Sequence, residues 1–146
     1  MPKRLIPALL LGWAVACSTD SGVTTTTPTP VTLTGNWNGP ISLQGFSASM
    51  TWQLTDTGSN VTGPVTILLP TGTVLLNGFL TGTVTGSSLS YTISVGPGGI
   101  PTQPNCVGQL KGTMTLTATT MNGSVGLSSS NCTSLSASTT VTLTKA

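Results

Sequence analysis

Three cysteines and two aspartates carry most of the chemistry that this 146-residue chain can offer. The sequence has no histidine, and its acidic residues are Asp20 and Asp56. General acid–base catalysis relies mostly on histidine or on a carboxylate in a tuned environment. A paired-carboxylate hydrolase and a serine triad would each lack an essential group, and no phosphate-binding glycine fingerprint precedes a helix. We therefore expect no catalytic residues and no cofactor.

The first residues have the layout of a secretory signal. Lys3 and Arg4 form a positive start, and residues 5–16 form an apolar run that ends in a small-residue cleavage site at 14–16. This run is too short for a membrane-spanning helix, which needs about 20 residues. Residues 1–16 are therefore predicted to be a signal peptide.

The sequence AVAC at 14–17 resembles the lipobox of bacterial lipoproteins, with Ala14 where that family prefers leucine. The resemblance implies that a peptidase cuts before Cys17 and that lipid is attached to its sulfur. Because each buried methylene contributes about 0.8 kcal/mol, several acyl chains hold such a protein stably in one leaflet. The resemblance to lipoproteins further implies a cell-envelope protein with the membrane as partner. Lipoproteins that stay in the inner membrane often have aspartate after the cysteine, so the resemblance implies that Ser18 favours the outer membrane.

Residues 17–30 are rich in threonine, serine and proline and have no hydrophobic period. This composition predicts an extended tether, partly in polyproline II, which reaches on the order of 30–40 Å at ~3.1 Å per residue. Removal of residues 1–16 leaves two lysines and two aspartates, so the side-chain charges cancel. With no basic patch to neutralise phosphates, no nucleic-acid partner is expected.

From Val31 onward apolar and polar residues alternate, which is typical of strands with one buried face. Phe46, Ala48, Met50, Trp52 and Leu54 form one such run. No apolar stripe of helical period follows the signal region. We expect eight strands, within residues 33–44, 46–55, 61–69, 74–84, 89–95, 110–118, 121–127 and 135–143.

The connections between these strands are mostly short, which favours a meander. We predict that residues 31–146 form an all-β domain, a closed eight-stranded antiparallel up-and-down barrel, because closure removes exposed sheet edges. A two-sheet β-sandwich is the alternative, since alternation does not separate the two. A transmembrane barrel would need aromatic girdles, for which the domain has few residues. Bulges or sharp bends are expected at five glycines within the strand patterns: Gly63, Gly78, Gly82, Gly112 and Gly123.

Cys106 and Cys132 lie on either side of the predicted strand pair 110–127. In an exported protein such a pair is expected to form a disulfide. Closing a loop of about 26 residues stabilises a fold by roughly 3–4 kcal/mol in the chain-entropy model. The bond would hold the irregular segment 96–106 against the far hairpin. A metal site is not expected, because histidine and the C-x-x-C spacing are both missing.

Gly35-Asn36-Trp37 resembles the G-x-W that opens lipocalin and avidin-like barrels. The resemblance implies a barrel in which Trp37 plugs one end. The chain departs from the lipocalin pattern, because the last strand has no arginine to stack on that tryptophan.

Trp52 and Tyr91 fall on inward, apolar faces. They either fill a packed core or line a small hydrophobic pocket at a barrel mouth. Asp56, in the turn sequence DTGSN, is expected to cap its own turn. Two functions remain open: a structural or surface-interaction domain that contacts other envelope proteins, or a lipocalin-like carrier with a small apolar ligand in the barrel.

Overall fold

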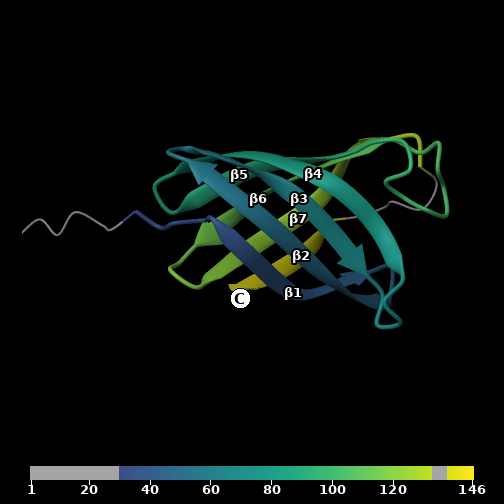
Figure 1. The fold of residues 1–146 in the computed structure, drawn as a ribbon, viewed down its shortest axis with the longest axis horizontal. Helices are drawn as coiled ribbons and strands as arrows, with labels where there is room; N and C mark the ends of the chain where they lie inside the picture. Colours follow the sequence, from purple (N-terminus) through teal and green to yellow (C-terminus); the bar gives the residue numbers. More distant parts are fainter. Residues whose placement is uncertain (1–29, 133–137) are drawn as a thin grey trace, which may run out of the picture.

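The computed structural model describes residues 30–132 and 138–146, which form eight β-strands. The strands are β1 (Gly35–Leu43), β2 (Phe46–Thr57), β3 (Asn60–Leu68), β4 (Val74–Thr85), β5 (Ser88–Val95), β6 (Gly108–Leu116), β7 (Thr120–Ser130) and β8 (Thr139–Lys145). Each pairs antiparallel with the next, and β8 pairs with β1, which closes the barrel (Figure 1). The predicted up-and-down barrel is confirmed, and the sandwich is excluded. Leu135 and Ala137 of the predicted last strand lie outside the described residues.

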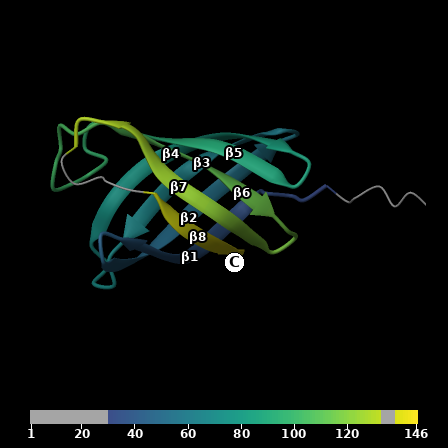
Figure 2. The ribbon, with the colours of Figure 1, turned by 180° about the vertical axis from the view of Figure 1, so that it is seen from behind.

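Because consecutive strands run in opposite directions, the barrel has two distinct ends. The terminal end contains the segment before β1, the end of β8 and three tight turns. The loop end contains the other connections, including the long one between β5 and β6, and lies opposite the segment before β1 in Figure 1. Seen from behind in Figure 2, β7, β8 and β1 lie side by side where the barrel closes.

The alternation in sequence becomes an inside and an outside in the barrel. In β2, Ala48, Met50, Trp52 and Leu54 are buried, while the serines, threonines and glutamine between them point outward. β-Branched threonine suits such a pleated, half-buried surface. Apolar side chains therefore face the interior, which is the reverse of the arrangement in membrane-spanning barrels.

Large side chains fill the barrel interior, as the narrow bore of an eight-stranded barrel allows. Those with essentially no exposed surface include Trp37, Met50, Trp52, Leu80, Leu89, Ile93, Met114, Met121 and Leu143. Two residues of the predicted inward set behave differently, and one of them is Ala118, which follows β6 and is exposed. The other is Phe46, which lies at the loop end of β2 and is 67% exposed.

None of the five glycines at which bulges or sharp bends were predicted lies at a bulge. Strand register continues through all five, and the register shifts lie between residues 67 and 68 in β3 and between 109 and 110 in β6. Gly63 shows why glycine occurs at such positions: a Cβ there would overlap the carbonyl oxygen of Gln53 on β2. Glycine occurs at this position because the backbone of the neighbouring strand leaves no room for a side chain, and not because the strand contains a bulge.

Candidate functional site

Trp37 lies at the terminal end of the barrel interior, where the sequence predicted a plug. Its side chain is fully buried, and its indole Nε1 donates a hydrogen bond of 2.8 Å to the carbonyl oxygen of Leu33. Leu33 is itself fully buried although it precedes β1. The segment that leads into the barrel is therefore part of its packed end.

Lys145, in β8, supplies the cation that the sequence comparison with lipocalins had missed. Its Nζ lies 5.4 Å from the ring centroid of Trp37 and donates a 2.7 Å hydrogen bond to the carbonyl oxygen of Thr32. A cation within about 6 Å of a tryptophan face is attracted by the ring. The cation over the tryptophan is therefore a lysine, where the lipocalin pattern has an arginine.

Asp56 does not cap its own turn, contrary to the prediction. Its Oδ2 accepts hydrogen bonds from the backbone N–H groups of Leu33, at 2.6 Å, and Thr34, at 3.3 Å. Its own N–H donates to the Thr34 hydroxyl at 3.0 Å. Hydrogen bonds to a carboxylate are stronger than neutral ones. We call Trp37, Asp56 and Lys145 the entry clamp, because together they hold the segment before β1.

Trp52 and Tyr91 are buried and pack against each other across the barrel. Their ring centroids lie 4.9 Å apart with planes at 66°, an edge-to-face arrangement. The Tyr91 hydroxyl donates a 2.8 Å hydrogen bond to the carbonyl oxygen of Ser124, whereas Trp52 Nε1 has no acceptor among the described residues. These contacts are those of a packed core, and neither residue lines the loop-end pocket described below.

Burial raises the pKa of the Tyr91 hydroxyl far above its ordinary value of 10.0. Above about pH 10 the unfolded chain therefore loses a proton that the folded chain keeps, so stability should fall as the pH rises, by up to ~1.4 kcal/mol per pH unit. Urea unfolding of the full chain from about pH 9 to pH 11 measures this slope. Tyr91→Phe should flatten this slope, because it removes the hydroxyl that titrates. Equal slopes in the two proteins would contradict the prediction.

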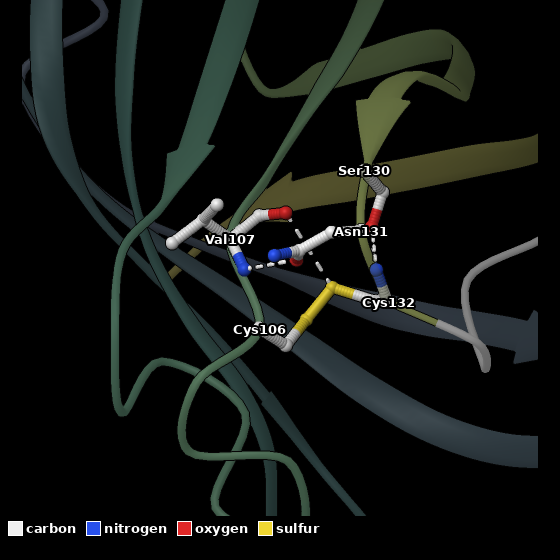
Figure 3. Close-up of a disulfide and its surroundings, with 5 residues drawn as sticks. All are labelled: Cys106, Val107, Ser130, Asn131 and Cys132. Atoms are coloured by element: carbon white, nitrogen blue, oxygen red, sulfur yellow. Dashed lines mark hydrogen bonds between the residues drawn. A yellow bond between two sulfur atoms is a disulfide. The ribbon is translucent and has the colours of Figure 1, made fainter.

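The predicted disulfide between Cys106 and Cys132 is confirmed (Figure 3), with Cα atoms 5.1 Å apart. Beside it, Val107 N–H donates to Asn131 Oδ1 at 2.8 Å, and Asn131 N–H donates to the Val107 carbonyl oxygen at 3.2 Å. The bond joins the segment 96–107, between β5 and β6, to the chain just after β7. It thereby ties two of the connections at the loop end together.

A cavity of about 310 Å³ opens at this loop end. Its apolar lining consists of Leu43, Phe46, Leu69, Leu75, Leu76 and Ile100. Three uncharged polar residues complete it: Gln44, Thr102 and Gln103. We call this cavity the loop-end pocket. Sequence reasoning missed it because its walls come from three separate connections that only the closed barrel brings together.

Two backbone features build the rim of the loop-end pocket. Ile100 is only 4% exposed, and Gly99, beside it, accepts a 2.7 Å hydrogen bond from the Asn77 N–H. The segment between β5 and β6 is thus folded onto β4. Gln44 and Gly45 form the two-residue turn between β1 and β2, with φ of 49° and 84°. Positive φ at both central residues is the type I′ turn, where asparagine or glycine is usual at the position of Gln44.

The part of the chain that the structure describes contains no cluster of three potential metal ligands. No helix in residues 30–132 and 138–146 is long and apolar enough to cross a membrane. The predicted signal peptide, Cys17 and nearly all of the tether lie outside the described residues.

No protein-family model matches the chain, and searches of curated proteins and of solved structures gave no significant match.

Proposed function

We propose that this protein is a lipid-anchored cell-envelope protein whose barrel is a non-catalytic interaction domain, with the loop end directed away from the membrane. The observation that carries the proposal is the difference between the two ends of the barrel. The chain enters at the terminal end, and Phe46, the most exposed large apolar side chain of the described residues, lies at the opposite end.

The entry clamp supports the proposed orientation. Asp56 binds the backbone of Leu33 and Thr34, and Lys145 binds that of Thr32, so the start of the domain is held at the terminal end. A tether that continues from this point towards lipid at Cys17 would leave the terminal end nearer to the membrane. The lipid itself is inferred from the resemblance to the lipobox, as is the outer membrane.

The loop end supports the proposed interaction. Phe46 exposes 67% of its surface beside the loop-end pocket. Exposed apolar surface that is rimmed by polar groups marks sites of interaction with proteins, membranes or ligands. The carrier alternative, with a ligand inside the barrel, is less well supported because large side chains occupy the interior.

The anchor is tested by the mass of the mature protein. The full chain, expressed with its leader in a bacterium, should yield a membrane-bound product that begins at Cys17 and carries lipid. Cys17→Ser should abolish both cleavage at that position and the lipid mass. A mature wild-type product without lipid would contradict the anchor.

The orientation is tested with the same full chain in vesicles that contain nitroxide-labelled lipids. A fluorophore at Ser59→Cys, in the turn between β2 and β3, should be quenched more strongly than one at Thr71→Cys, between β3 and β4. These two exposed positions lie at opposite ends of the barrel. Equal quenching, or stronger quenching at position 71, would contradict the proposed orientation.

A further inference from the structure

We propose that the loop-end pocket binds the single alkyl tail of an amphiphile whose head group is uncharged. This inference rests on the proposed role of the loop end as the interaction surface and names its ligand class. It does not depend on the lipid at Cys17.

The size of the pocket fits one short tail. Its volume of about 310 Å³ lies at the lower limit of ligand pockets, which span roughly 300–1,000 Å³. A methylene group occupies about the same space as a water molecule, ~30 Å³, so about ten carbons would fill the pocket. Four leucines and one isoleucine in the lining favour a flexible aliphatic chain.

The charges of the barrel favour an uncharged head group, because none of them lies at the pocket. The described charged side chains are Asp56, Lys111 and Lys145, and none of them lines the pocket. Asp56 and Lys145 belong to the entry clamp at the other end, and Lys111 is exposed on the outer wall of β6. A carboxylate or phosphate that left water at the pocket would therefore meet no opposite charge, which is costly.

The polar residues of the pocket match an uncharged head. The two amides of Gln44 and Gln103 and the hydroxyl of Thr102 can each donate and accept hydrogen bonds. An amide or hydroxyl head group needs the same mixture of donors and acceptors. Because these polar side chains lie beside the aliphatic lining, the pocket has an apolar part for a tail and a polar part for a head group.

The backbone of Gln44 belongs to the hairpin turn at the edge of the pocket. Among the described residues it is the non-glycine residue with positive φ, 49°. The two-residue type I′ turn requires this φ, and the turn places Gln44 at the pocket lining.

The proposal is tested by NMR on the full chain in lipid nanodiscs, with isoleucine δ1 methyl groups labelled. Hexanamide, octanamide, decanamide and dodecanamide are titrated in turn. Ile100 should shift saturably, and Ile93, which is fully buried in β5 and does not line the pocket, should not. Affinity should rise roughly fourfold with each added methylene and level off near ten carbons. This residue-specific signal separates binding from partition into the bilayer.

Two matched comparisons make the test specific. Phe46→Ser should weaken octanamide binding at least tenfold, whereas Phe79→Ser should leave it unchanged, because Phe79 is 50% exposed on β4 and does not line the pocket. Both side chains are exposed, so neither change should unfold the barrel. Octanoate, with the same tail and a negative head, should bind at least tenfold more weakly than octanamide.

Three results would overturn the proposal. If octanoate binds as tightly as octanamide, the pocket does not discriminate against a charged head group. If Ile100 shifts with no alkanamide, the pocket does not take alkyl tails. If Ile100 instead shifts with protein concentration, and Phe46→Ser abolishes that shift, a second copy of the chain is the occupant. That last result would still be consistent with a role of the loop end in interaction. Lipid attachment at Cys17 is tested separately, by the mass of the mature protein.

Discussion

Trp37→Ala should destabilise the domain by about 3–5 kcal/mol, the usual cost of truncating a fully buried tryptophan. The substitution empties the terminal end of the barrel, removes the hydrogen bond to Leu33 and takes away the ring beneath Lys145. Since small domains are stable by only about 5–15 kcal/mol, a large share of the total would be lost. Urea unfolding of the full chain measures the change through the midpoint of the transition.

Two further variants separate the causes of that loss. Trp37→Phe keeps an aromatic ring but leaves the Leu33 carbonyl without its donor, so it should cost less than Trp37→Ala. Phe79→Ala removes a half-exposed ring from the outer wall and should change stability by no more than about 0.5–1 kcal/mol. A cost below about 1 kcal/mol for Trp37→Ala would show that the terminal end repacks without its plug.

Loss of the disulfide between Cys106 and Cys132 should cost roughly 3–4 kcal/mol. The bond closes a loop with a sequence separation of 26, and the chain-entropy model relates that length to the stabilisation. The expected signal is a lower urea midpoint in the presence of reductant. The double variant Cys106→Ser, Cys132→Ser should have the lower midpoint already and should not respond to reductant.

Reduction of the disulfide should also affect the loop-end pocket. Ile100 lies in the segment between β5 and β6 that the bond ties to the end of β7, so its methyl signal should broaden or shift when the bond is reduced. Cys17→Ser, which leaves the bond in place, should retain the response to reductant. An unchanged midpoint in reductant would mean that hydrogen bonds such as that of Val107 to Asn131 hold the loop end without the disulfide.

Strand positions were predictable because burial in a barrel follows a period of two. Trp52 and Leu54 point inward and their neighbours outward, as the alternation requires. Phe46 departs from this rule, because β2 begins with it at the open loop end, where an inward position no longer implies burial. The alternation of apolar and polar residues therefore predicts burial in the middle of a strand better than at its ends.

The entry clamp was not predictable, since it joins residues far apart in sequence. Asp56 and Leu33 are 23 positions apart, and Lys145 and Thr32 are 113 apart. Local rules for aspartate in turns therefore pointed to the wrong partners. Closure of the barrel places the end of β8 beside β1, and this adjacency decides which groups the two charges bind.

Residue types and their alternation were enough to predict the all-β class, the eight strands, most of the inward side chains and the pairing of Cys106 with Cys132. These features depend on residue type and local period, which require no knowledge of distant neighbours. The tertiary structure decided that the interior is filled, that Trp52 and Tyr91 pack together, and that three connections enclose a pocket at the loop end. Those features depend on which side chains meet across the barrel, and only the closed sheet brings them into contact.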